Sequence, residues 1–194
     1  GTGLILDDDA QPSLTIDSVT VNEGAGTATF TVSLDAPSGK TVTVDYASMD
    51  AAAQAGADYT AVAGTLSFAP GVVSQTITVA ITNDALYEGS EGFLIGLSAA
   101  SNATIAVASG LGTILDDGTG SGGTDDDRPA VKIAGASVNG AIGTVFLTVQ
   151  LDKPAAVPVT VNYASADGVA LAGADYTAVS GTVTFAPGVT TQTI

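Results

Sequence analysis

Hydrophobic and polar residues alternate with a period of two along most of this chain, which is the pattern of β-strands with one buried face. Turn-forming pairs such as Pro70-Gly71 and Asn83-Asp84 separate the alternating stretches. About seven short strands within about 100 residues predict an all-β antiparallel β-sandwich, with a small barrel as the alternative. The predicted strands are 14–21, 28–34, 42–46, 65–68, 77–82, 93–98 and 104–115.

The sequence also repeats itself along its length. The motif Gly56–Val62 returns as Gly173–Val179, with an offset of 117 residues (173 − 56). Phe68–Val72 returns as Phe185–Val189 with the same offset (185 − 68). A fixed period of this kind indicates tandem copies of one structural unit.

The repeats divide the chain into four predicted pieces. Residues 1–9 are the last strand of a preceding repeat, and residues 10–117 are a complete repeat. Residues 118–128 are a linker whose Gly and Ser residues predict flexibility, and residues 129–194 are an incomplete second repeat. Because this last piece lacks counterparts of Thr78–Asp117, we expect exposed strand edges that permit strand exchange with another chain. The chain begins within the pattern and shows no signal peptide, so we expect a piece of a longer protein.

Acidic residues gather in particular turns of this strand map. In an up-and-down sandwich the turns after the first, third and fifth strands share one end, and the seventh strand finishes there. Carboxylates brought together at that end repel one another unless a cation neutralises them. Ca²⁺ accepts irregular sets of six to eight oxygen ligands, whereas Mg²⁺ requires stricter geometry. A calcium site is therefore predicted, with a solvated acidic surface as the alternative. The predicted ligands are Glu23, Asp50, Asp84, Glu88, Glu91, Asp116 and Asp117.

Composition supports a cation partner and excludes several kinds of chemistry. Four basic residues face 20 acidic ones, giving a net charge of −16, so we expect no binding to nucleic acid or anionic membranes. The chain has no Cys and no His, which removes the usual zinc ligands and any Ser-His-Asp or Cys-His mechanism. No apolar run reaches the length of about 18 residues that a membrane span requires, so we expect no membrane insertion. The sequence therefore predicts a protein that is not an enzyme.

Several spaced motifs resemble the Calx-β domain family. They are Asp58-Tyr59, Gly64–Phe68, Asn83–Phe93 and Ile114–Asp117, and the resemblance covers residues 12–117 and most of 129–194. It implies an immunoglobulin-like sandwich and a calcium-binding role, as in the sensor domains of sodium/calcium exchangers and in bacterial surface proteins. The family's ligand positions fall on the seven acidic residues predicted above.

The second repeat departs from the family pattern. Gly140 replaces the counterpart of Glu23, and Asp167 matches Asp50, while the acidic loop and the terminal acidic pair have no counterpart in 129–194. We therefore expect a complete calcium site only in residues 10–117. In that repeat Asn83 stands where the family often has an acidic residue, and Asp7–Asp9 are expected to belong to the site of a preceding repeat.

Three functions are compatible with these features. The first is a structural repeat of an extracellular bacterial adhesin-like protein, secreted or at the cell surface, in which calcium stiffens the domain tip and the junction between neighbouring repeats. The second is a calcium-sensing regulatory module with higher affinity. The third is a carbohydrate-binding module or a glycosidase with paired carboxylates, which the scarcity of aromatic residues (5%) and the absence of Trp disfavour.

Overall fold

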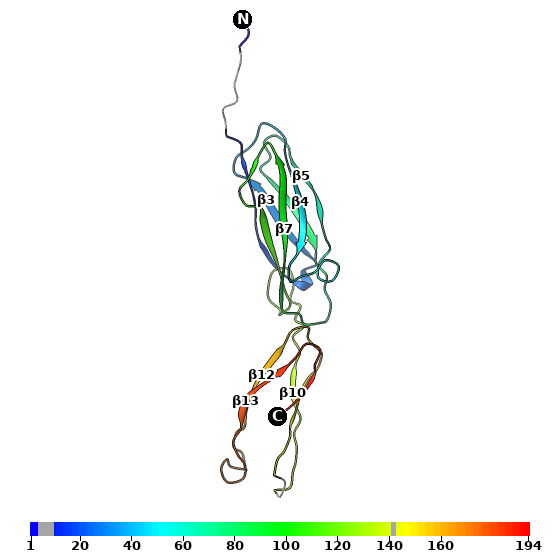
Figure 1. The fold of residues 1–194 in the computed structure, drawn as a ribbon, viewed down its shortest axis with the longest axis vertical. Coiled ribbons are helices and arrows are strands. Elements are labelled where there is room, and N and C mark those ends of the chain that lie inside the picture. The colour runs from blue at the N-terminus through cyan, green and yellow to red at the C-terminus, as the bar shows by residue number, and fades with distance from the viewer. Residues whose placement is uncertain (4–9, 141–142) are drawn as a thin grey trace. The chain divides into compact units, whose positions relative to one another are not determined.

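The computed structural model describes residues 1–3, 10–140 and 143–194. They form two compact units, one of 1–83 with 90–125 and the other of 84–89 with 126–194 (Figure 1). The boundary between 125 and 126 lies inside the predicted linker. Most of the predicted remnant strand, including Asp7–Asp9, lies outside the described residues. No helix in the described part of the chain is long and apolar enough to cross a membrane.

The first unit is a sandwich of two β-sheets, which confirms the predicted fold class. One sheet has the strand order β6-β3-β1-β8, and the other has the order β2-β9-β7-β4-β5. A short 3₁₀ helix, η1 (Glu23–Ala25), joins the two sheets after β2. The strands are β1 (Ser13–Ile16), β2 (Val19–Asn22), β3 (Thr27–Leu34), β4 (Val42–Asp50), β5 (Ala63–Phe68), β6 (Ser74–Ala80), β7 (Ser90–Ser101), β8 (Thr104–Ile105) and β9 (Ser109–Leu115).

The predicted first and last strands are each split between the two sheets, which sequence periodicity did not show. β1 pairs in parallel with β8, and β2 pairs in parallel with β9, so the sandwich is not antiparallel throughout. The switch after β1 is held by Asp17, whose carboxylate accepts a 2.7 Å hydrogen bond from the Thr31 amide. The hydroxyl of Ser18 accepts a 3.0 Å bond from the Leu111 amide. These partners lie far away in the sequence, so a local pattern cannot reveal the break.

Aromatic side chains fill the space between the sheets near the acidic end. Phe93 packs edge-on against Phe30, with 5.8 Å between ring centroids, and stacks on Tyr59 at 4.4 Å. All three residues are buried. Gly112 lies opposite Phe93 on the neighbouring strand, and a Cβ at this position would come within 2.6 Å of the Phe93 ring. The glycine therefore makes room for the aromatic cluster.

The second unit repeats part of this architecture. Its strands are β10 (Val131–Ile133), β11 (Thr148–Leu151), β12 (Val159–Ala164), β13 (Ser180–Phe185) and β14 (Thr191–Thr193). They form one sheet of order β10-β11-β14 and a two-stranded sheet of β12 and β13. The described residues of this unit contain no counterpart of β7 or β9.

Two apolar residues of this unit are more exposed than their counterparts in the first unit. Val131 and Ile133 are 43% and 57% exposed, whereas their counterparts Leu14 and Ile16 in the first unit are 0% and 5% exposed. An uncovered apolar face next to an open strand edge favours pairing with a further strand. The predicted strand exchange stays a prediction.

Candidate metal centre

Strand register brings several of the predicted carboxylates to one end of the first unit. Asn22, the last residue of β2, lies opposite Leu115, the last residue of β9. Leu115 in turn lies opposite Ser90 at the start of β7, and Asp50 at the end of β4 lies opposite Phe93. Glu23, Glu91 and Asp116 each adjoin one of these paired residues. The sandwich therefore ends in a group of acidic side chains that come from separate strands.

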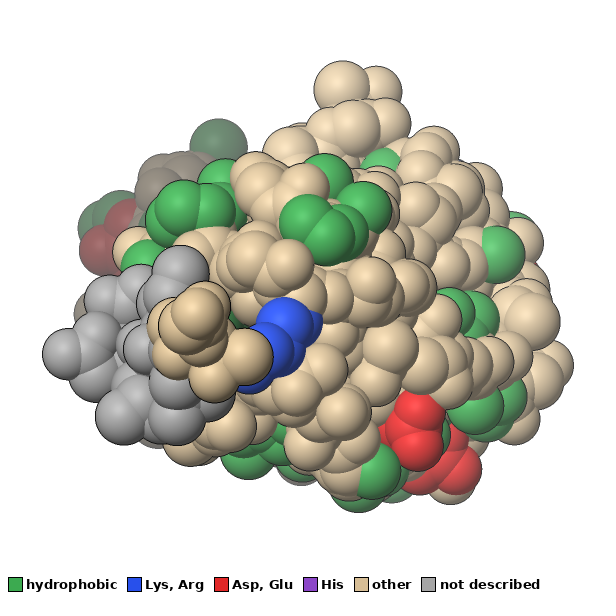
Figure 2. Space-filling model, turned by 90° about the horizontal axis from the view of Figure 1, so that it is seen from above, with side chains coloured by type: hydrophobic (Ala, Val, Ile, Leu, Met, Phe, Trp, Pro, Cys, Tyr) green, Lys and Arg blue, Asp and Glu red, His purple; other side chains and the backbone are tan. Residues whose placement is uncertain are grey.

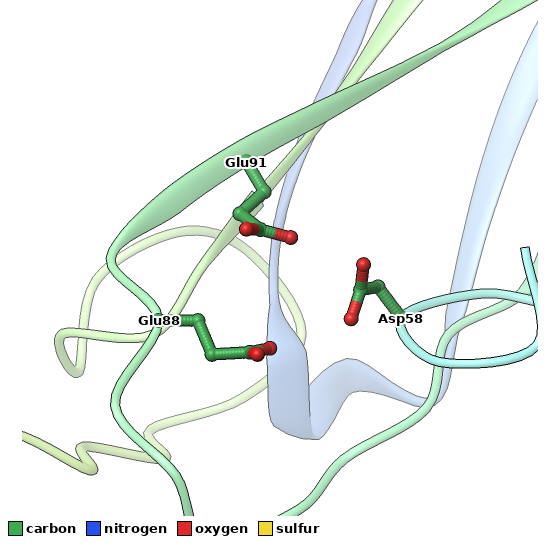
Figure 3. Close-up of side chains that lie close together, drawn as sticks. All are labelled: Asp58, Glu88 and Glu91. Atoms are coloured by element: carbon green, nitrogen blue, oxygen red, sulfur yellow. The ribbon is translucent and has the colours of Figure 1, made fainter. Parts of the chain in front are cut away.

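Three carboxylates of the first repeat, residues 10–117, lie close together. Asp58, Glu88 and Glu91 each contribute a carboxylate oxygen, and these oxygens lie within 4.8 Å of one another (Figure 3). Glu91 is the second residue of β7, and Glu88 lies three residues before it on the connection from β6. Asp58 comes from the loop between β4 and β5. All three side chains are partly buried.

The β4–β5 loop has a defined structure that presents Asp58 to the other two acids. The Gln54 amide donates a 2.6 Å hydrogen bond to Oδ2 of Asp58, which closes the loop on itself. The Thr82 amide donates a 2.9 Å bond to the Asp58 carbonyl, and Tyr59 forms a β-bridge with Ile81. The loop is therefore tied to the chain that leaves β6. The same connection from β6 to β7 carries Glu88.

The donor set fits a hard divalent cation. It consists only of carboxylate oxygens, which Ca²⁺ and Mg²⁺ prefer. Two oxygens bound to one calcium ion at 2.3–2.6 Å lie at most about 5 Å apart. A mutual spacing within 4.8 Å therefore allows all three oxygens to share one ion. Three carboxylates so close also repel one another by about 1–3 kcal/mol per pair, depending on the effective dielectric constant. A cation would reverse this repulsion.

Glu23 and Asp116 form a second acidic pair, deeper in the structure. Glu23 is 5% exposed and Asp116 is 2% exposed. Each follows directly after the last paired residue of two adjacent parallel strands, Asn22 of β2 and Leu115 of β9. Burial of a charged group is costly unless a hydrogen bond, an opposite charge or a metal compensates it. Two buried carboxylates on neighbouring strand ends add negative charge beside the partly buried cluster.

Comparison with known proteins identifies the family of this chain. A family model described as the Calx-beta domain matches residues 7–118 and 124–194, which is nearly the whole chain. This chain belongs to the Calx-beta domain family. The sequence resemblance is thereby confirmed, and the two matched segments correspond to two Calx-beta repeats.

Curated relatives of these Calx-beta repeats include sodium/calcium exchangers. Sodium/calcium exchanger 1 from Bos taurus is 32% identical over 148 residues, which cover 70% of this chain and 15% of the exchanger. The exchanger from Canis lupus familiaris is 43% identical over 58 residues, which cover 30% of this chain and 6% of the exchanger. The chain therefore spans only a small part of the length of these relatives.

Solved structures support the fold of both repeats. The apo form of the Calx CBD1 domain is 29% identical, with a TM-score of 0.53, and the match covers 56% of this chain and 99% of that domain. The structure of CBD12 from CALX1.2 is 24% identical, also with a TM-score of 0.53, and the match covers 94% of this chain and 74% of that structure. The second match shows that the fold of most of this chain also occurs in another protein.

In the first Calx-beta repeat Asp50 has a different environment from the cluster. Its Oδ1 accepts a 2.6 Å hydrogen bond from the Tyr59 hydroxyl and a 2.8 Å bond from the Ala55 amide. These two bonds stabilise the charged form, so the pKa of Asp50 lies below its ordinary value. Burial raises the pKa of the Tyr59 hydroxyl, and the hydrogen bond to Asp50 raises it further. The bonds tie Asp50 to the loop that carries Asp58, and its role as a metal ligand stays a prediction.

Asp84 and Asp117 make local hydrogen bonds. Oδ1 of Asp84 accepts a 2.7 Å bond from the Leu86 amide, and Oδ1 of Asp117 accepts a 3.0 Å bond from the Thr119 amide. Contacts of this kind are typical of Asp in turns. Of the seven predicted ligands, the structure brings Glu88 and Glu91 into one close cluster, and it brings Glu23 and Asp116 to adjacent strand ends. The ligand roles of all seven stay predictions.

Asp58 is the member of the cluster that sequence reasoning did not include among the ligands. A signal for it was present, because Asp58 lies in the same turn as Asp50, and that turn was already assigned to the acidic end. Its motif also returns at Asp175, where Oδ2 accepts a 2.9 Å hydrogen bond from the Leu171 amide. Among the described residues no close acidic cluster includes Asp175. The position therefore recurs in the second repeat without its acidic neighbours.

The N-terminal end of the first repeat has a different surface. Seen from this end, most of the described surface is uncharged, with scattered hydrophobic side chains, a basic group and acidic side chains only toward the edges (Figure 2). A hollow of about 310 Å³ is lined by Pro12, Pro37, Lys40 and neighbouring residues, without a carboxylate. This lining does not suit a cation. Among the residues that the structure describes, the two ends therefore differ in charge, and the acidic end is the better candidate for function.

Proposed function

We propose that the first Calx-beta repeat is a calcium-binding module that has no catalytic activity. The observation that carries this proposal is the cluster of Asp58, Glu88 and Glu91, whose carboxylate oxygens lie within 4.8 Å of one another. Buried Glu23 and Asp116 at adjacent strand ends strengthen it. Membership of the Calx-beta family supports the same ion, because the matched relatives are exchangers whose names include calcium.

Calcium suits this end better than other divalent cations. The donors come from a loop, a strand connection and several strand ends, so their arrangement is irregular. Ca²⁺ tolerates such sets and takes six to eight oxygens, whereas Mg²⁺ needs near-octahedral geometry and keeps several waters. The chain has no Cys or His for zinc or copper. The number of carboxylates at this end leaves room for more than one calcium ion.

Binding would have a mechanical consequence for the repeat. Without a cation, repulsion among the carboxylates opposes close approach of the β4–β5 loop and the β6–β7 connection. With a cation, the same oxygens hold these segments together, since each becomes a ligand of one ion. Calcium would therefore stiffen the acidic end and the chain that leaves it toward the next repeat. We infer that this stiffening is the function of the module.

We further propose that the stiffened repeat is part of the stalk of an extracellular, adhesin-like surface protein from a bacterium. The tandem arrangement and the net charge of −16 support this proposal, because rows of repeats separate a binding tip from the cell surface. Millimolar calcium outside cells would fill even a weak site. Neighbouring repeats of the same chain are then the principal partners.

A calcium-sensing module is the second candidate. It is favoured by the 32% identity to sodium/calcium exchanger 1 over 148 residues. Affinity separates the two functions, because sensors bind calcium with dissociation constants of about 10⁻⁷–10⁻⁵ M, whereas extracellular modules bind at about 10⁻⁴–10⁻³ M. Weak binding supports the stalk, and micromolar binding supports the sensor.

Titration calorimetry of the whole chain with CaCl₂ and then MgCl₂ tests the proposal. We expect saturable calcium binding, with Mg²⁺ at least about tenfold weaker. Glu91→Gln keeps the size of the side chain and removes its charge, so calcium affinity should fall by about tenfold or more. Asp45→Asn is the matched control, because Asp45 lies on β4 and its carboxylate accepts a 2.6 Å bond from the Thr65 hydroxyl away from the cluster. Absence of calcium binding by the unaltered chain would falsify the proposal.

A further inference from the structure

Asn22 is a buried polar residue at the centre of a dense hydrogen-bond network. It is 0% exposed, and it precedes Glu23 at the start of η1. Its side-chain amide donates to the carbonyl oxygens of Thr119 and Asp125, each at 3.0 Å, and at 3.4 Å to that of Leu115. One side chain therefore connects the end of β2, the end of β9 and the glycine-rich segment that follows.

The same side chain also accepts hydrogen bonds. Its Oδ1 accepts from the amides of Gly24 and Asp125, both at 3.0 Å. The Gly24 bond caps η1, and the Asp125 bond fixes the far end of the glycine-rich segment. Buried amides are stable only when their donors and acceptors are satisfied, and here both are used. The glycine-rich segment therefore supplies hydrogen-bond partners for the buried Asn22 side chain, and Asn22 in turn fixes the segment.

The segment Gly118–Asp125, named here the linker clasp, lies against the first repeat. The backbone N–H of Asn22 donates to the Ser121 carbonyl at 3.0 Å, and the Ser121 hydroxyl donates to the Thr20 carbonyl at 2.8 Å. Val21 and Ser121 form a parallel β-bridge. β2 is an edge strand of its sheet, so the linker clasp covers backbone groups that an edge would otherwise present to other chains.

Glycine is required at defined positions of the linker clasp. A Cβ at Gly123 would lie 2.5 Å from Oδ1 of Asn22, which is closer than non-bonded atoms approach. Gly120 has a φ of +91°, and a Cβ there would lie 2.8 Å from the Asn22 amide nitrogen. The glycines therefore permit close packing of backbone on Asn22. Composition alone indicated a flexible spacer, whereas these contacts describe a fitted segment.

We propose that Asn22 and the linker clasp position the carboxylates of Glu23 and Asp116 for a bound cation. Glu23 directly follows Asn22, and Asp116 directly follows Leu115, whose carbonyl accepts the Asn22 amide proton. The network thus fixes the backbone beside both buried acids. Asn22 is a positioning residue in this arrangement, and the glycine-rich linker is a component of the binding end.

This role deepens the proposed calcium-binding function and rests on it. Groups that orient metal ligands from outside the ligand set typically change metal affinity by about 10–100-fold when they are altered. Loss of the linker clasp would leave Glu23 and Asp116 in the chain but release the backbone that aims them. The affinity of the first repeat for calcium would then depend on residues that lie outside the sandwich itself.

Hydrogen exchange and calcium titration of the whole chain test the proposal together. In the calcium-free chain we expect the amides of Gly118 and Asp125 to be protected, because the first donates to the Asp125 carbonyl at 2.8 Å and the second to Asn22. Gly123→Ala should expose these amides and weaken calcium binding by about tenfold or more. Gly39→Ala is the matched control, since a Cβ at Gly39 would meet nothing within 4 Å.

Ser121→Ala provides a milder variant that removes only the bond from the exposed Ser121 side chain to the Thr20 carbonyl. It should give a smaller increase in exchange without unfolding the sandwich. Free exchange of Gly118 and Asp125 in the unaltered chain would overturn the linker clasp. Full calcium affinity in Gly123→Ala would overturn its positioning role alone. Failure of the unaltered chain to bind calcium would instead overturn the proposed function and, with it, that role.

Discussion

Replacing Asp58 with Asn should stabilise the calcium-free protein and weaken its response to calcium. The change keeps an oxygen that accepts the 2.6 Å hydrogen bond from the Gln54 amide, and it removes one of three mutually repelling charges. At 4.8 Å two unit charges repel by about 0.9 kcal/mol in water and about 3.5 kcal/mol at an effective dielectric constant of 20. Because the side chains are only partly buried, the lower repulsion energy of about 0.9 kcal/mol per pair applies. Two pairs then amount to about 2 kcal/mol at low salt, or about 8 °C in melting temperature.

Calcium should shift the same variant less than the unaltered chain. Calcium at a hundredfold excess over the dissociation constant stabilises the unaltered protein by about 2.7 kcal/mol. A tenfold loss of affinity at the same calcium concentration reduces this gain to about 1.4 kcal/mol. Thermal unfolding in chelator and in calcium, at low ionic strength, measures both effects in one series. A rise in salt should shrink the difference in chelator, since salt screens repulsion between partly exposed charges.

Asp175→Asn is the matched control for this prediction. Asp175 occupies the corresponding position of the second repeat and accepts a 2.9 Å bond from the Leu171 amide, but it belongs to no close acidic cluster among the described residues. A charge change there should alter neither the calcium-free melting temperature nor the calcium response. Equal shifts in both variants would refute the reasoning, because they would show a general effect of lowering a net charge of −16. An unchanged calcium response in Asp58→Asn would also refute it.

Three further predictions concern the aromatic core and its hydrogen bonds. Phe93→Ala should lower the free energy of unfolding of the first repeat by about 3–5 kcal/mol in a urea titration, and a loss under 1 kcal/mol would contradict its central place in the core. Gly112→Ala should cost about 1–3 kcal/mol in the same assay, because the new methyl group would meet the Phe93 ring, and a neutral result would contradict that contact. The lowered pKa of Asp50 gives a contribution to stability that is present above about pH 4 and is lost as pH falls through that pKa. Melting temperatures between pH 5 and 2 should therefore fall more steeply for the unaltered chain than for Asp50→Asn, and parallel curves would rule this out.

The sandwich was predictable because its strands have one buried and one exposed face. Phe30, Val32 and Leu34 alternate with polar residues in the sequence, and the structure buries all three. The split of the first strand was not predictable in the same way. It depends on Asp17 and on its hydrogen bond to the Thr31 amide, which joins residues 14 positions apart. Periodicity indicates which face of a strand is buried, but it does not show which sheet the strand joins.

The site was predictable at the level of strand ends. Strand order places the turns that carry Glu23, Glu91 and Asp116 at one end, and the register agrees. Which acids meet closely was not predictable, because it depends on how the β4–β5 loop folds over the end of β6. Asp58 can therefore be assigned to the cluster only from the structure, in which the Thr82 amide donates a hydrogen bond to the Asp58 carbonyl. The contacts of the linker clasp were missed for the same reason, since glycine content suggests flexibility and says nothing of a buried partner such as Asn22.

Comparison of the two repeats shows which features of the loop between Asp50 and Asp58 depend on the loop itself and which depend on the neighbouring strands. The Tyr59 hydroxyl donates to Asp50 at 2.6 Å, and the Tyr176 hydroxyl donates to Asp167 at 2.7 Å. The carboxylates of Asp58 and Asp175 each accept a hydrogen bond from the backbone amide four residues earlier, so the loop has the same internal bonds in both repeats. Because the second unit lacks described counterparts of β7 and β9, these bonds do not require the complete sandwich. The carboxylate of this loop becomes a candidate ligand only where β7 and the connection before it bring two glutamates beside it. Calcium binding, on this view, belongs to the assembled end of the sandwich, and the loop motif alone should not bind the ion.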